Sequence, residues 1–194
     1  AIIELVNRIV LAGKKSAGSR PQIRISLSTF VPKPHTPFQW VAQDSKENLD
    51  AKHEMLTRGL RQKSIRLSWQ EPSTSLLEAV LSRGDRRLGR VIHLAWQKGS
   101  VFDGWGEYFN YQNWLDAFDE AGLEPDCYAR RQRPLDEPLP WSHIDVGLRE
   151  GFLKKEYQRS QENRVTADCR YQKCNACGLE RWHNWCRSKY RQIS

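Results

Sequence analysis

The stretch QIRISLSTFVPKPHTPFQW, residues 22–40, decides the fold expected for this chain. Ile23, Ile25 and Leu27 alternate with polar residues, and this period of two predicts a strand over 22–30 with one buried face. The ten residues that follow contain three prolines within six positions, which excludes a regular strand ladder. We therefore expect a strand that leads directly into a stiff, extended loop.

The sequence on both sides of this stretch predicts helices and one more strand. Apolar spacing and capping residues predict helices over 2–12, 44–62, from Ser75 to Gly84, from Asp85 to Gly99, over 110–122 and over 146–163. A second strand is predicted over 65–69, and the proline- and arginine-rich residues 123–142 are interpreted as a connection. Strands that alternate with helices are typical of a parallel sheet, which two strands alone do not sustain. Because the chain also opens at Ala1 on an apolar run, we expect a piece of a larger protein.

Composition narrows the functional class only partly. Hydrophobic residues make up 39% of the chain, and 8 Trp, 6 Tyr and 6 Phe must supply much of its core. The net charge of +8 favours anionic partners such as nucleic acid, with a solvated basic surface as the alternative. No apolar run approaches the roughly 18 residues that cross a bilayer, and no signal peptide is recognisable. We expect a soluble cytoplasmic protein without a membrane partner.

Several segments closely resemble one known family. Residues 28–40, STFVPKPHTPFQW, are similar to the segment that closes the catalytic barrel in cobalamin-binding radical S-adenosylmethionine (radical SAM) proteins. The resemblance continues through residues 77–87, 96–105, 152–157 and 168–170, and so covers nearly the whole chain.

The resemblance implies an α/β fold with three parts. Residues 1–72 would form the C-terminal portion of a radical SAM partial (β/α)6 TIM-like barrel, 73–142 a mainly helical region and connection, and 143–194 a helix plus a small Cys-rich metal-binding tail. It also implies S-adenosylmethionine, a 4Fe-4S cluster and cobalamin as cofactors of the full-length protein. The expected partners are upstream radical SAM and B12-binding domains, with RNA or another large anionic substrate as a further candidate.

Two signatures of that family are absent from this sequence. It contains neither the C-x3-C-x2-C cluster motif nor the D-x-H-x2-G motif by which an upstream domain binds cobalamin. Methyl transfer or another C–H functionalisation is therefore expected only of the full-length enzyme, and the isolated chain should be inactive. The alternative is a non-catalytic RNA- or protein-binding module with a zinc knuckle.

The ends of the two predicted strands contain candidate ligand-binding residues, since parallel α/β barrels collect their ligands at the carboxyl ends of strands. The candidates for a substrate or S-adenosylmethionine pocket are Phe30, Lys33, His35, Phe38, Gln39, Trp40, Ser68 and Trp69. The alternative is an aromatic plug whose polar groups face solvent.

A charged run at a predicted helix start supplies candidate anion-binding residues. Arg83, Arg86 and Arg87 could offer guanidinium groups to a phosphate beside free backbone N–H groups. In the alternative interpretation Asp85 caps the helix, and the arginines form ion pairs.

The tail contains a cysteine pattern suited to a metal. Cys169-x4-Cys174-x2-Cys177 brings three thiols within nine residues, and Cys186 follows as a fourth ligand, with His183 as its substitute. Four such donors satisfy tetrahedral zinc. The three-cysteine spacing also matches a plant-type 2Fe-2S arrangement, so zinc and iron-sulfur both remain open.

Overall fold

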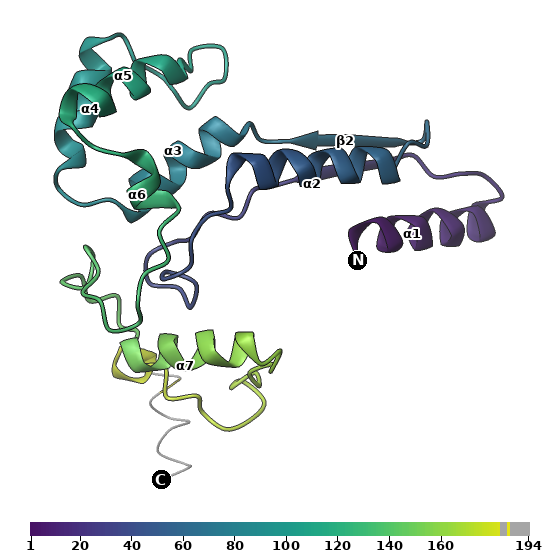
Figure 1. The fold of residues 1–194 in the computed structure, drawn as a ribbon. Helices are drawn as coiled ribbons and strands as arrows, with labels where there is room; N and C mark the ends of the chain where they lie inside the picture. Colours follow the sequence, from purple (N-terminus) through teal and green to yellow (C-terminus); the bar gives the residue numbers. More distant parts are fainter. Residues whose placement is uncertain (183–185, 187–194) are drawn as a thin grey trace. The chain divides into compact units, whose positions relative to one another are not determined.

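The computed structural model describes residues 1–182 and Cys186 (Figure 1). The chain divides into two compact units. The N-terminal unit comprises residues 1–31 and 43–78, and the C-terminal unit comprises residues 32–42 and those from 79 onward. The boundary between the units falls inside one helix, α3 (Pro72–Arg83).

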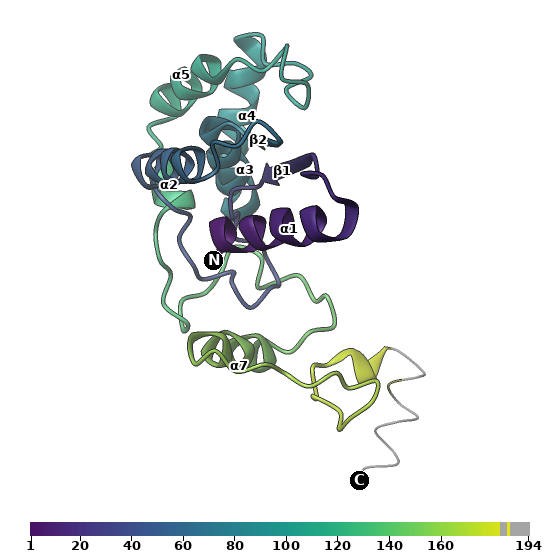
Figure 2. The ribbon, with the colours of Figure 1, turned by 90° about the vertical axis from the view of Figure 1, so that its right-hand side faces the viewer.

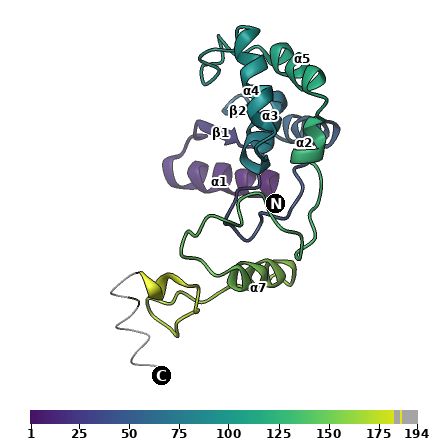
Figure 3. The same ribbon diagram turned by 90° about the vertical axis from the view of Figure 1, so that its left-hand side faces the viewer.

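The N-terminal unit is built around a β–α–β arrangement. Its elements are α1 (Ile2–Ala17), β1 (Ile23–Leu27), α2 (Lys46–Gly59) and β2 (Ile65–Trp69), followed by the first turns of α3. The strands pair in parallel, with Ile23 opposite Ile65 and Leu27 opposite Trp69. Figures 2 and 3 both show α1 alongside β1. Val6 and Val10 of α1 pack with Leu60 and Ile65, so one stripe of α1 closes the small core of this unit.

The prediction of a partial (β/α)6 TIM-like barrel is wrong. In the residues that the structure describes, β1 and β2 are the only strands, and they form a sheet of two. The physical reason lies in the sequence beyond β2, where apolar residues recur every three or four positions and form helices. The described part of the chain is mostly helical, with one short parallel sheet.

The C-terminal unit is helical apart from its loops. It contains α4 (Leu88–Gln97), α5 (Tyr111–Ala121), α6 (Pro125–Ala129), α7 (Glu150–Gln161) and a short 3-10 helix, Leu179–Arg181. Helices α4 and α5 pack against each other. A second core joins Trp40, Leu139, Trp141 and Leu153, so the loop after Val31 belongs to this unit.

Helix α1 differs from prediction at its C-terminal end, and α2 differs at both ends, since it ends at Gly59 rather than near Gln62. α1 continues past the expected end near residue 12 and ends before Gly18, whose left-handed backbone (φ 69°) returns its N–H to Lys14 O. α2 is capped by Ser45 rather than Asp44, because the Ser45 side chain accepts the N–H of Asn48.

β1, α4 and α7 are each shorter than the ranges predicted for them, which were 22–30, Asp85 to Gly99, and 146–163. Proline accounts for two further differences. α3 begins at Pro72, before the expected cap Ser75, because a proline suits the first helical turn, whose N–H groups have no helical partner. The connection predicted over 123–142 contains α6, which Pro125 also opens. Among the described residues, no helix combines the length and apolar character needed to cross a membrane.

Candidate functional site

The proline-rich loop is anchored to the core of the C-terminal unit by its last two residues. Trp40 is fully buried, and its ring centroid lies 6.1 Å from that of Tyr157. The Gln39 side chain is also buried, where its Oε1 accepts hydrogen bonds from Trp141 Nε1 at 2.8 Å and from the His35 N–H at 3.0 Å. Both predicted pocket residues are therefore enclosed by protein.

Three other predicted pocket residues of this loop are at least partly accessible. Lys33 is exposed, and its Nζ donates to Ser82 Oγ at 3.1 Å. His35 is half-buried and adopts a positive φ of 56°, which is uncommon for a residue other than glycine. The exposed Phe38 ring meets Tyr157 edge to face at 6.4 Å.

The remaining pocket candidates belong to the N-terminal unit. Phe30 follows β1 and is half exposed. The Ser68 hydroxyl donates to Ile25 O at 3.5 Å, and Trp69 stacks on His53 with ring centroids 4.6 Å apart. The predicted pocket is thus divided between the two units, with five of its residues in one and these three in the other.

The charged run before α4 forms an ion pair. The Asp85 carboxylate accepts the backbone N–H of Arg87 at 2.9 Å and its Nη2 at 2.7 Å, and this pairing lowers the pKa of Asp85. The guanidinium and backbone N–H of Arg87, which were predicted to contact a phosphate, thus donate to Asp85. The exposed Arg86 lines a neighbouring hollow together with Asp85, Pro34 and His143. An ion pair between Asp85 and an arginine was the alternative interpretation of this charged run. Phosphate binding at this helix start stays a prediction.

Arg83 is buried, unlike Arg86 and Arg87. Its Nη1 and Nη2 donate to Ala129 O at 2.7 Å and Arg131 O at 2.9 Å. Arg133, which is 4% exposed, donates in turn from its Nη2 to Arg83 O at 2.7 Å. Burial, together with the guanidinium groups of Arg133 and Arg131, lowers the pKa of Arg83 to about 10. These arginines connect the end of α3 to the segment after α6.

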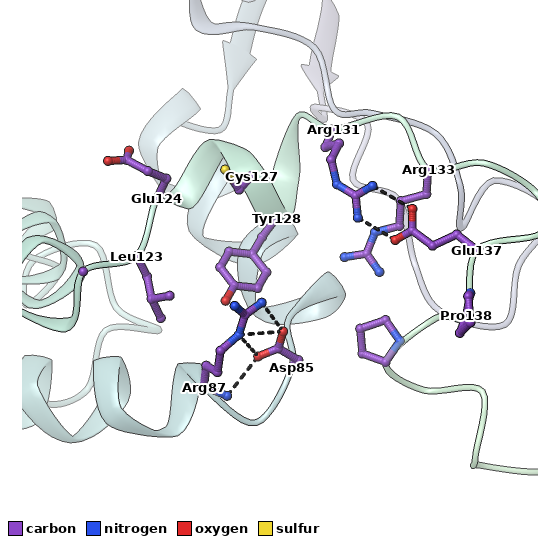
Figure 4. Close-up of a pocket in the computed structure, with 12 residues that line it drawn as sticks. Asp85, Arg87, Leu123, Glu124, Cys127, Tyr128, Arg131, Arg133, Glu137 and Pro138 are labelled. Atoms are coloured by element: carbon purple, nitrogen blue, oxygen red, sulfur yellow. Dashed lines mark hydrogen bonds and ion pairs between the residues drawn. The ribbon is translucent and has the colours of Figure 1, made fainter.

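A cavity of about 450 Å³ lies beside this arginine group. Its lining residues are Asp85, Arg87, Gly122, Leu123, Glu124, Cys127, Tyr128, Arg131, Arg133, Glu137, Pro138 and Pro140 (Figure 4). Arg131 pairs with both carboxylate oxygens of Glu137, at 2.7 and 2.5 Å. Interpreting 123–142 as a mere connection missed this site, although its clustered arginines were a visible signal.

The tail adopts a tight turn at its C-x2-C pair. The Ala176 N–H donates to Cys174 Sγ at 3.4 Å, and Ala176 and Gly178 have positive φ values of 52° and 113°. Arg149 N–H donates to Cys177 O at 2.8 Å, which joins the turn to the start of α7.

Three of the tail cysteines lie close enough to Cys186 to affect its thiol. Burial raises the pKa of the Cys186 thiol, and the nearby Cys177, Cys169 and Cys174 raise it further. Among residues 1–182 and Cys186, however, no three potential ligands converge closely enough to hold an ion. The proposed substitute ligand His183 lies outside the described residues. The metal site therefore stays a prediction.

Comparison with known proteins leaves the family open. No protein-family profile and no solved structure matches the chain. An uncharacterized protein of Methanocaldococcus jannaschii is similar, with 21% identity over 120 residues. The match covers 62% of this chain but only 27% of that relative, so the chain corresponds to about a quarter of the relative's length.

Proposed function

We propose that this chain is the C-terminal part of a cobalamin-binding radical SAM enzyme that performs methyl transfer or another C–H functionalisation. The catalytic iron-sulfur segment would lie outside these 194 residues, and the chain alone would be inactive. This proposal rests on the family resemblance and does not require the barrel, which the described residues do not form.

One structural observation supports the proposal. Three segments that carry the resemblance are far apart in sequence, and the proline-rich loop contacts both of the others within the C-terminal unit. Lys33 Nζ donates to Ser82 Oγ at 3.1 Å, and the rings of Phe38 and Trp40 both contact Tyr157. Residues that resemble a family and also pack together in the fold are more informative than the same residues scattered over a surface.

The residues of this chain could serve substrate binding in the proposed reaction but could not bind the iron-sulfur cluster. When bound in such enzymes, the cluster supplies the electron that cleaves S-adenosylmethionine, and this sequence lacks the motif that would bind it. Of the loop's pocket candidates, Lys33, His35 and Phe38 keep accessible surface, whereas Gln39 and Trp40 are enclosed by the core. The role that the accessible residues can take is to contact a substrate or to exclude water from it.

The test uses the protein encoded by the complete gene, purified without oxygen. We expect about four iron atoms per cluster, with sulfide, and release of 5′-deoxyadenosine from S-adenosylmethionine with a strong reductant. The 194-residue chain, assayed in parallel as the control, should release none. A complete protein that has no iron-sulfur cluster and yields no 5′-deoxyadenosine would contradict the proposal.

The tail favours a second candidate, a non-catalytic RNA- or protein-binding module with a zinc knuckle. The observation behind it is the turn at Cys174–Cys177, with its N–H donated to sulfur, beside the mutually interacting Cys169 and Cys186. We expect about one zinc per chain, lost when Cys174 and Cys177 are changed to Ser. Salt-sensitive RNA binding by the chain alone would support the module. Absence of both metal and RNA binding would exclude it.

A further inference from the structure

Two buried arginines in the C-terminal unit have no acidic partner. Arg83 is fully buried and Arg133 is 4% exposed, yet their guanidinium groups donate to the backbone carbonyls of Ala129, Arg131 and Arg83 itself. Within residues 1–182, neither guanidinium forms an ion pair with a carboxylate. Buried arginines are rare unless they are paired, because removing a charge from water is costly.

The hydrogen bonding of this pair is also incomplete. Arg83 Nε and Arg133 Nε are both buried without a hydrogen-bond partner. The Trp141 ring lies 5.2 Å from the Arg133 guanidinium carbon and stabilises the cation from one side without accepting its N–H groups. A polar group left in this state normally has a ligand or water as its partner.

A third arginine adds to the positive charge around Arg83 and Arg133. Arg131 lies close enough to lower the pKa of both Arg83 and Arg133, with burial as the larger cause for each. Glu137 is the one carboxylate that opposes this effect on Arg83, and it is already paired with Arg131. Asp85 is a second carboxylate near Arg133, and it is paired with Arg87. Four guanidinium groups therefore face two carboxylates, each already paired with an arginine, which leaves an excess of positive charge in a partly enclosed place.

The cavity in Figure 4 gives an anion access to this charge. Arg133 and Arg131 line it, and Figure 4 shows the Arg133 guanidinium beside the Arg131–Glu137 pair. Asp85 is neutralised by Arg87, and the Glu124 carboxylate points away from the other charged groups. Leu123, Pro138 and Pro140 supply apolar wall, and the volume of about 450 Å³ exceeds what a lone inorganic anion fills.

We propose that this cavity binds a small molecule that carries a phosphate or carboxylate group. The oxyanion pairs with Arg133 and Arg131, and the apolar part of the molecule lies against Leu123 and the prolines. This site is separate from the predicted S-adenosylmethionine pocket. It borders the helix start at Asp85 and Arg87 but binds the oxyanion through Arg133 and Arg131, and it does not rest on the proposed enzymatic activity.

The test measures binding of pyrophosphate and of citrate to the 194-residue chain by calorimetry, with ionic strength held constant by chloride. Pyrophosphate represents a phosphorylated ligand and citrate a carboxylated one, so their relative affinity identifies the class. The informative variant is Arg131→Gln, which leaves the buried Arg83 and Arg133 intact. Its matched control is Arg130→Gln, because the adjacent Arg130 also pairs with one carboxylate, Asp126, but does not line the cavity.

We expect at least one probe to bind with a dissociation constant below about 1 mM and to lose roughly tenfold or more in affinity in the Arg131→Gln variant. Arg130→Gln should leave the affinity within about twofold. Two results would overturn the proposal: neither probe binds better than chloride, or both variants weaken binding equally, which would attribute it to general positive charge. Circular dichroism of each variant checks that the fold is retained.

Discussion

The role of Gln39 can be decided by its effect on stability. In the structure its Oε1 accepts the buried Trp141 Nε1–H and the part-buried His35 N–H. The change Gln39→Leu keeps a side chain of similar size but removes the acceptor for both donors. If Gln39 were a pocket residue, as the sequence indicated, this change would affect ligand binding and leave stability nearly unaltered.

The expected cost follows from the two hydrogen bonds. A buried donor left without a partner costs about 1–3 kcal/mol, and loss of the part-buried bond adds about 0.5–1.5 kcal/mol. We therefore expect Gln39→Leu to lower the free energy of unfolding by roughly 2–4 kcal/mol. Trp141→Phe removes the buried donor, so the double variant should be more stable than the sum of the single effects predicts, by about 1–2 kcal/mol.

The assay is urea unfolding followed by far-ultraviolet circular dichroism, because Trp141→Phe alters tryptophan fluorescence. The control is Gln161→Leu at the exposed end of α7, which should change stability by less than about 0.5 kcal/mol. The reasoning is refuted if Gln39→Leu costs no more than this control, or if the effects of the two single variants simply add.

Three further predictions concern the tail and the cavity. Gly178→Ala should lower the free energy of unfolding by about 1–3 kcal/mol or more and weaken metal retention, since φ is 113° and the added Cβ would lie 2.3 Å from Gly147 O. The control Gly151→Ala, in open space within α7, should leave the melting temperature unchanged or raise it slightly, because alanine favours a helix over glycine. Arg131 holds the pKa of Glu137 below its usual value, so the stability that this pairing contributes is present above pH about 4.3 and is lost as pH falls through the lower folded-state pKa. Acid unfolding of Glu137→Gln should lack that contribution, and an unchanged profile would count against the pairing. A chelator should lower the melting temperature if the tail binds zinc, and the variant with Cys174 and Cys177 changed to Ser should show no such shift.

Local sequence patterns determined much of the secondary structure. The strand predicted over 65–69 matches β2, and the helix predicted over 110–122 differs from α5 by one residue at each end. These elements were predictable because period and capping depend on neighbouring residues. The barrel was not, because the number of strands in a sheet depends on pairing between distant segments, and the described residues supply only two strands.

The candidate site residues also fall into those recognisable from local sequence and those brought together only by the fold. The sequence by itself identified the cysteine pattern and the charged run at Arg83–Arg87, since ligand type and spacing are local properties. Only the tertiary structure decided that Gln39 and Trp40 are enclosed by the core, and that Arg83, Arg131 and Arg133 meet beside one cavity. Burial and charge imbalance arise from contacts between residues as far as 50 and 102 positions apart, and such contacts leave no periodic trace in the chain.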